Sequence, residues 1–365
     1  MRGGPVTLFL CGDVMLGRGV DQILPYPGDP ALQERWIRDA RAYVDLAETA
    51  HGPIPQPVDF SWPWGDALEL LDAAAPDVRV LNLETSITRA DEFAPDKEVH
   101  YRMNPANLPC LTAARPDVCV LANNHVLDFG RRGLGETLTT LADAGLRTAG
   151  AGHNAVAARQ PAIVPLPDGG RVLVFSFGMP TSGIPHDWAA TDELPGVDFV
   201  TQRSQAATAD RLHQAKHPGD LAVASIHWGS NWGYDVPTAD IRFAHALIDA
   251  GADIVHGHSS HHPRPAEVYR GKLVLYGCGD FIDDYEGITG YEQYRDDLRL
   301  LHLVSVDPEN GLLLEARMIP LQARQMRLRP ASSRDTEWLR TTLDHVSDSF
   351  GTRITAAPDG TLVLR

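Results

Sequence analysis

Five short apolar segments of this chain each lead into side chains that can bind a metal ion. The most distinctive is residues 252–255, which is typical of a buried strand and is followed by four histidines within seven positions. Neutral imidazole is a good ligand for zinc, manganese, iron and nickel, and imidazoles that leave one strand end can converge on one point. A solvated loop rich in histidine is the simpler alternative, but four histidines so close together favour a metal-binding or catalytic site. They are His256, His258, His261 and His262.

The other four segments repeat this arrangement earlier in the chain. They are the predicted strands at 6–10, 78–83, 118–122 and 221–226. Predicted helices at 66–75, 133–144 and 239–250 alternate with them, which indicates an α/β fold with functional loops at the strand ends. The potential ligands at these ends are Asp13, Glu84, Asn124 with His125, and His227.

Three later strands indicate a second, more antiparallel sheet: 272–276, 300–306 and 312–319. The tail predicts a helix near 335–346 and a small hairpin. We therefore expect one domain over residues 1–320 and a C-terminal extension over residues 321–365.

The composition argues against several partners. The 365 residues carry a formal net charge of −16, whereas a nucleic-acid partner requires a basic surface. No segment has the length of a membrane span, and the apolar run at 6–10 is too short for the core of a signal peptide. The cysteines show no CxxC spacing and lie in or beside apolar runs, as buried thiols do in a reducing compartment. We expect a cytoplasmic protein without a nucleic-acid or membrane partner, and the oligomeric state stays open.

The potential ligands suit a site for one or two divalent ions. Two metal ions about 3.5–4 Å apart need a bridging carboxylate together with oxygen and nitrogen ligands from several elements. This chain offers that set, and manganese, zinc, iron, calcium and magnesium all stay possible. No organic cofactor is expected.

The order of the motifs resembles that of the CapA (PgsA) family of poly-γ-glutamate synthesis. The motifs are GDVMLGR at 12–18, NLETSIT at 82–88, NNHVLDFG at 123–130, HWG at 227–229, GHSSHH at 257–262 and GDF at 279–281. The resemblance covers roughly residues 5–320. Because that family is similar to calcineurin-like metallophosphatases, it implies a four-layer α/β/β/α sandwich with two facing sheets flanked by helices.

The resemblance also implies a role for each matching residue. Asp13, Glu84, Asn124, His227 and His261 fall on ligand positions, and His125 falls on the position of the catalytic histidine. Metallophosphatases usually carry a histidine where this chain has Met15. Their G-x-H-x-H motif is here Gly257-His-Ser-Ser-His261, so His258 is our choice for the displaced ligand. His262 is then free to act as an acid or base. His256 is either a further candidate for that acid–base role or a core residue of the strand.

Three residues are candidates for binding the substrate. Trp228 and Trp232 flank His227, and we expect them to form a wall for an apolar or aromatic group. Arg102, in a loop between motifs, can pair with a substrate carboxylate. Lys97, in the same loop, could pair with a substrate carboxylate as well. The alternative for both residues is a solvated charge on the loop.

The function that we favour from the sequence is epimerisation at the terminal Cα of a peptide. Some members of this group resemble the lasso-peptide epimerase type, which inverts the C-terminal residue of a ribosomal precursor without an organic cofactor. A metal that holds the terminal carboxylate would stabilise the enediolate, and spare histidines such as His125 and His262 would move protons on its two faces. The expected partner is a peptide or a small carboxylate-bearing molecule. The alternatives are a metal-dependent phosphoesterase, a protein of poly-γ-glutamate capsule synthesis and a non-catalytic, metal-dependent binding protein.

Overall fold

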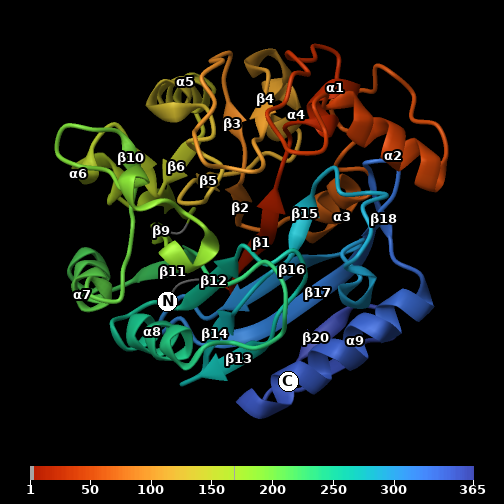
Figure 1. Ribbon diagram of the computed structural model, residues 1–365. Helices are drawn as coiled ribbons and strands as arrows, with labels where there is room; N and C mark the ends of the chain where they lie inside the picture. The colour runs from red at the N-terminus through yellow and green to blue at the C-terminus, as the bar shows by residue number, and fades with distance from the viewer. Residues whose placement is uncertain (1–3, 168) are drawn as a thin grey trace.

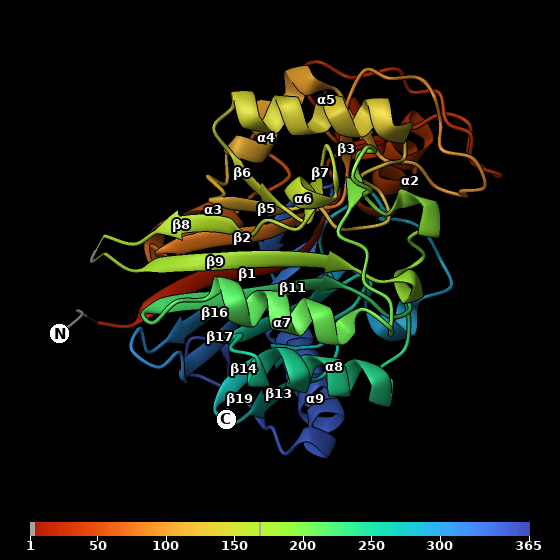
Figure 2. The same ribbon diagram turned by 90° about the vertical axis from the view of Figure 1, so that its left-hand side faces the viewer.

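Alternating side chains along β1 (Val6–Val14) explain how the layers of this protein pack. Leu8 and Leu10 point into one apolar core, whereas Phe9 and Cys11 point into a second core on the other face of the strand. A strand that is buried on both faces needs a covering layer on each side. In the computed structural model, which describes residues 4–167 and 169–365, a second sheet covers one face and helices cover the other (Figures 1 and 2).

The first sheet has parallel strands at its centre. β1 pairs in parallel with β2 (Val78–Leu83), which pairs in parallel with β5 (Val118–Val120). On its other side β1 pairs antiparallel with β16 (Leu298–Val306), and the short strand β15 (Asp280–Ile282) pairs in parallel with the end of β1. The other strands of this sheet are β6 (Arg147–Ala149), β17 (Leu313–Ala323), β18 (Leu328–Pro330), β19 (Ile354–Ala356) and β20 (Leu362–Leu364).

The second sheet faces the first and is parallel in its middle. β11 (Asp220–His227) lies between β9 (Arg171–Gly178) and β12 (Ile254–His258) and pairs in parallel with both. β12 pairs in parallel with β14 (Lys272–Leu275). The edges are β8 (Ala162–Pro165) and β13 (Ala266–Tyr269), and two small pairs lie apart: β3 (Ser86–Ile87) with β4 (Arg102–Met103), and β7 (Ala151–Gly152) with β10 (Gly196–Val197).

Helices form the two outer layers. Apolar residues of α2, α3, α4 and α5 pack on the outer face of the first sheet, and those of α7 and α8 pack on the outer face of the second. The expected four-layer α/β/β/α sandwich is therefore confirmed. In the described part of the chain, no helix has both the length and the apolar character needed to cross a membrane. The helices are α1 (Gly19–Ile23), α2 (Arg41–His51), α3 (Ala67–Ala74), α4 (Leu108–Thr112), α5 (Gly130–Asp143), α6 (Ala155–Ala158), α7 (Gln205–Ala215), α8 (Thr238–Asp249) and α9 (Ser333–Ser347).

The predicted second, antiparallel sheet is wrong. The strand at 272–276 becomes β14 of the mainly parallel sheet, and the other two strands become β16 and β17, which extend the first sheet beyond β1. The order of the strands in each sheet differs from their order in the chain. Apolar runs that are neighbours in the sequence therefore lie in different sheets. The boundary expected at residue 320 falls inside β17, and β20 pairs with that strand.

Two histidines are buried between the sheets. His302 lies on β16 opposite Leu10 of β1, and His256 lies on β12 of the facing sheet. Burial, and to a smaller extent the neighbouring His256, lower the pKa of His302 to about 3. Both rings are therefore neutral in the folded protein near pH 7.

We predict that His302 makes the stability of the protein depend on pH. Its folded pKa of about 3 lies below the ordinary value of 6.5, so the unfolded chain binds more protons between these values. His302 should therefore lower the free energy of unfolding by about 2 kcal/mol as the pH falls from about 7 to about 5. Urea unfolding of chelator-treated protein at both pH values measures this loss.

In the variant His302→Leu, the loss between the two pH values should be smaller by that amount. His153→Leu, at an exposed position, is the control and should keep the wild-type pH dependence. An unchanged pH dependence in His302→Leu would show that this ring does not titrate on unfolding.

Candidate metal centre

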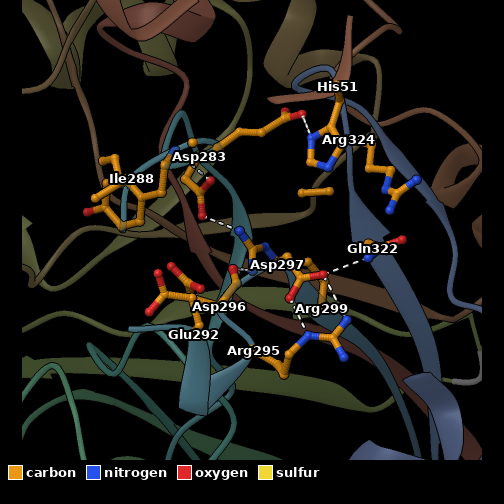
Figure 3. A pocket seen from close by; sticks show the side chains of 14 residues that line it. His51, Asp283, Ile288, Glu292, Arg295, Asp296, Asp297, Arg299, Gln322 and Arg324 are labelled. Atoms are coloured by element: carbon orange, nitrogen blue, oxygen red, sulfur yellow. Dashed lines mark hydrogen bonds and ion pairs between the residues drawn. The ribbon is translucent and has the colours of Figure 1, made fainter. Parts of the chain in front are cut away.

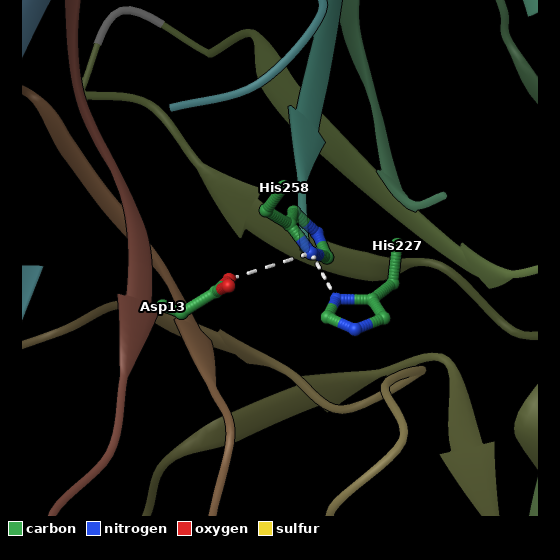
Figure 4. A group of neighbouring side chains, drawn as sticks. All are labelled: Asp13, His227 and His258. Atoms are coloured by element: carbon green, nitrogen blue, oxygen red, sulfur yellow. Dashed lines mark hydrogen bonds and ion pairs between the residues drawn. The ribbon is translucent and has the colours of Figure 1, made fainter. Parts of the chain in front are cut away.

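The ends of β1, β11 and β12 bring Asp13, His227 and His258 together where the two sheets meet. All three side chains are buried, and one ligand atom from each lies within 4.8 Å of the others (Figure 4). His258 Nδ1 lies 3.9 Å from Asp13 Oδ1 and 2.9 Å from His227 Nδ1. The other ring nitrogen of His227 lies 2.9 Å from Asn124 Oδ1. These four residues form the first donor group.

A second donor group shares Asp13 with the first. It consists of Asp13, His261 and Asp280, again with one atom of each within 4.8 Å of the others. His261 Nδ1 lies 3.0 Å from Asp280 Oδ1, and β15 places Asp280 beside Asp13 in parallel register. Asp280 is absent from the residues predicted from the sequence, although it follows an apolar run as the other ligands do. That position in the GDF motif was the available signal.

Glu84 completes the carboxylates of the centre. Its Oε1 lies 3.7 Å from His125 Nε2 and 3.8 Å from His227 Nε2. The Asn82 side-chain amide donates to Asp13 Oδ1 at 2.7 Å and to Glu84 Oε2 at 3.2 Å, which holds the two carboxylates in place. Asn82 was not predicted either.

The charges of this site fit a bound cation. Burial, and then Asp280, raise the pKa of Asp13 to about 7, and burial raises the pKa of Glu84 well above its ordinary range. Burial also lowers the pKa of His227 and His258 well below the ordinary value. Crowded carboxylates beside neutral imidazoles are costly to bury without a positive partner. Divalent metal ions take this mixed oxygen and nitrogen donor set.

A chain of hydrogen bonds fixes which nitrogen of His258 is free. The Cys11 carbonyl oxygen can only accept, so His256 Nε2–H donates to it at 2.8 Å. Burial lowers the pKa of His256 to about 4, so its Nδ1 is unprotonated and accepts from Ser225 Oγ at 3.1 Å. Ser225 Oγ then accepts from His258 Nε2–H at 2.9 Å. The lone pair of His258 Nδ1 is left facing Asp13 and His227.

His125 lies at the edge of the centre with a carboxylate behind it. Asp128 Oδ2 is 2.7 Å from His125 Nδ1, and because a carboxylate accepts, the ring donates from Nδ1 and turns Nε2 towards Glu84. Burial lowers the pKa of His125 to about 4, although Asp128 raises it. Lys97 forms an ion pair with Asp128 and donates to the Asn124 carbonyl. The arrangement resembles the histidine–carboxylate pairs that hold a proton carrier in one orientation.

A cavity of about 360 Å³ opens onto these groups. It is lined by residues from segments that follow or connect the strands, among them Glu84, Lys97, Asn124, His125, His261 and Tyr285. A substrate in this cavity would contact His125 and both donor groups.

Trp228, Arg102 and His262 are predicted site residues that lie outside this lining. The Trp228 side chain is buried and donates to the Tyr276 carbonyl at 2.9 Å. Arg102 donates to the carbonyls of Ala90 and Asp29. His262 is held by aromatic rings, and its Nε2 is buried without a hydrogen bond. None of these three side chains therefore lines the cavity beside His125 and His261.

Trp232 lies closer to the centre. Its ring contacts His261 with the ring centroids 5.3 Å apart and stacks on Tyr291 at 4.0 Å. It packs against a potential ligand without lining the cavity.

A second cavity, of about 310 Å³, lies beyond Asp283 (Figure 3). Arg299 forms an ion pair with Asp283 across its wall, as Arg295 does with Asp297, and His51 forms a hydrogen bond with Glu286. Because these pairs already neutralise one another, the first cavity is the better candidate for a reacting site.

Comparisons with known proteins agree with the motifs. The family model described as "Bacterial capsule synthesis protein PGA_cap" matches residues 7–285. The chain is 54% identical over 368 residues to the "Probable polyglutamine synthesis accessory protein" of Mycobacterium tuberculosis (strain H37Rv), which covers 99% of this chain and 97% of that protein. It is 30% identical over 223 residues to the "PGA biosynthesis protein CapA" of Bacillus subtilis, which covers 61% of this chain and 56% of that protein.

Among solved structures, the chain is similar to the 5′-nucleotidase precursor of Thermus thermophilus. The TM-score is 0.49 at 14% sequence identity, and the match covers 96% of this chain and 61% of that one.

We predict that Asp13 and Asp280 differ in how much metal their loss removes. Asp13 belongs to both donor groups, so Asp13→Asn should lose nearly all bound metal. Asp280 belongs to one group, so Asp280→Asn should lose about half of a two-ion complement. Elemental analysis after loading with manganese and gel filtration measures the stoichiometry. Equal losses in the two variants would contradict a shared carboxylate.

Ser225→Ala should weaken metal binding without removing a ligand. The change breaks the relay that leaves His258 Nδ1 free, and loss of such a supporting residue lowers metal affinity about 10–100-fold. A chelator competition titration measures the affinity. Ser230→Ala, at an exposed position, is the control. Wild-type affinity in Ser225→Ala would mean that the His258 tautomer is set in another way.

Proposed function

Because the chain belongs to the bacterial capsule synthesis protein PGA_cap family, we propose that it is a metal-dependent hydrolase with an accessory role in polyamino-acid synthesis. The names of its relatives support the accessory role, and the geometry of the centre supports the reaction. The substrate class that we propose is a phosphate ester.

The observation that carries this proposal is the position of Asp13 in two adjacent donor groups. Asp13, Asn124, His227 and His258 would hold one ion, and Asp13, His261 and Asp280 would hold the other. Glu84 would bind an ion on the side of the centre that faces His125. Two ions bound in this way supply polarisation of a phosphoryl oxygen and a water of lowered pKa. The second group has two carboxylates, which favour a harder ion such as manganese or magnesium.

His125 would carry the proton that the leaving group needs. Asp128 holds the ring through Nδ1–H, so the unprotonated Nε2 faces the cavity, where it would take a proton from the attacking water and pass it to the leaving oxygen. Asp128 would also stabilise the charged ring while the proton is held. Lys97 holds Asp128 in place through an ion pair.

The epimerase predicted from the surplus of histidines has less support. The names of the relatives point to polymer synthesis, and inversion requires a proton carrier on each face of the substrate. His262 lies in the aromatic cluster, and His256 is engaged in the relay to Cys11. His125 would then serve one face alone, which suits hydrolysis better.

The test is turnover of an aryl phosphate ester by manganese-loaded protein. His125→Ala should lower turnover about 10²–10⁴-fold, because it removes the proton carrier, while the bound metal stays at the wild-type level. His153→Ala, at an exposed turn, is the matched control. Full turnover in His125→Ala would show that another group carries the proton.

A parallel incubation in deuterated water with peptides of different C-terminal residues separates the two reactions. Phosphate release without deuterium uptake is the expected result. Deuterium uptake at a terminal Cα, with inversion of its configuration, would support the epimerase hypothesis instead. Metal-dependent binding without either reaction would support the non-catalytic alternative.

A further inference from the structure

Tyr285 stands on the wall of the cavity between the two histidines that line it. Its ring meets the ring of His261 edge-on, with centroids 5.1 Å apart at 86°. Its hydroxyl lies 2.7 Å from the hydroxyl of Tyr101, whose ring meets His125 edge-on at 4.5 Å. The two tyrosines thus connect the second donor group with the proposed proton carrier.

Two buried ion pairs anchor the two residues that precede Tyr285. Asp283 pairs with Arg299, and Asp283 Oδ1 accepts from the Tyr285 backbone N–H at 3.1 Å. Asp284 binds the guanidinium of Arg18 through both carboxylate oxygens. The four charged side chains of these pairs are all buried. These bonds fix the backbone that leads into Tyr285, which positions its ring before any substrate arrives.

The Tyr285 hydroxyl has a proton without a good acceptor. Tyr101 donates to the Tyr285 oxygen, so the Tyr285 proton must point elsewhere. Its contact is the Met15 sulfur at 3.7 Å, and a thioether is a weak acceptor. Among the described residues, this hydroxyl of a cavity-lining side chain has no strong acceptor for its proton.

We propose that Tyr285 binds the substrate, by donating its hydroxyl hydrogen bond to a phosphoryl oxygen held at the metal centre. The Met15 contact is exchanged for the oxyanion, and Tyr101 keeps the Tyr285 oxygen in place during the exchange. The inference rests on the proposed function, because it takes the substrate to be a phosphoryl compound.

The experiment is a calorimetric titration of manganese-loaded protein with inorganic phosphate. Tyr285→Phe removes only the hydroxyl, and loss of one hydrogen bond to a charged group should weaken phosphate binding about tenfold. Manganese content should stay at the wild-type level, since Tyr285 is outside both donor groups. Tyr26→Phe, at a surface position, is the matched control and should bind phosphate as the wild type does.

Tyr101→Phe distinguishes a hydrogen bond donated by Tyr285 to phosphate from the support that Tyr101 gives to Tyr285. It leaves the Tyr285 hydroxyl in place and removes its fixed partner, so phosphate binding should weaken less than in Tyr285→Phe. Equal phosphate affinity in Tyr285→Phe and wild type would overturn the proposal, as would loss of manganese together with phosphate. Absence of phosphate binding in the loaded wild type would overturn it too. Tenfold weaker binding in Tyr285→Phe without any ester turnover by the wild type would leave this inference standing and refute the proposed hydrolase.

Discussion

Burial of the Asp13 carboxylate among other ionisable groups is the constraint on which the rest of the centre depends. Asp280 and Glu84 lie beside it, and each carboxylate makes ionisation of the next more costly. Two hydrogen-bond donors stabilise the ionised form of Asp13: the Asn82 amide and the Ser259 backbone N–H. Ser259 adopts a φ of 100°, which is uncommon for a residue with a side chain, and this conformation turns its N–H towards the carboxylate. The remaining deficit of positive charge is what a divalent ion would supply.

The sequence predicted the parts of this centre that follow from strand direction. Parallel strands bring their carboxyl ends to one edge, so polar residues after apolar runs meet there, as Asp13, His227 and His258 do. Asp280 was missed because its strand is only three residues long and pairs with β1 across more than half of the chain. The direction of side chains could not be predicted from proximity in the sequence. Trp228 follows His227 directly, yet successive residues at a strand end point to opposite faces, and its ring is buried on the other side.

The tautomer relay shows why isolated motifs give an incomplete account of a site. His256 belongs to the histidine cluster, but its ring points between the sheets and bonds to the carbonyl of Cys11 on β1. Ser225 of β11 donates a hydrogen bond to His256 and accepts one from the Nε2–H of His258 on β12. Three strands from two sheets thus determine one lone pair. No pattern in the sequence encodes this, because it depends on the distance between the sheets and on which partners can only accept.

The first and last motifs of the chain form one structural unit, and this unit explains the position of Tyr285. A Cβ at Gly12 would lie 1.6 Å from the Gly279 carbonyl oxygen, so only glycine allows β15 to approach β1 this closely. That approach sets Asp13 beside Asp280. A few residues further on, Arg18 binds Asp284 and fixes the start of the loop that carries Tyr285. Buried ion pairs add little net stability, because desolvation offsets their attraction, but they tolerate few alternative arrangements. Here they hold two distant segments in the register that places a carboxylate and a phenol at the same cavity.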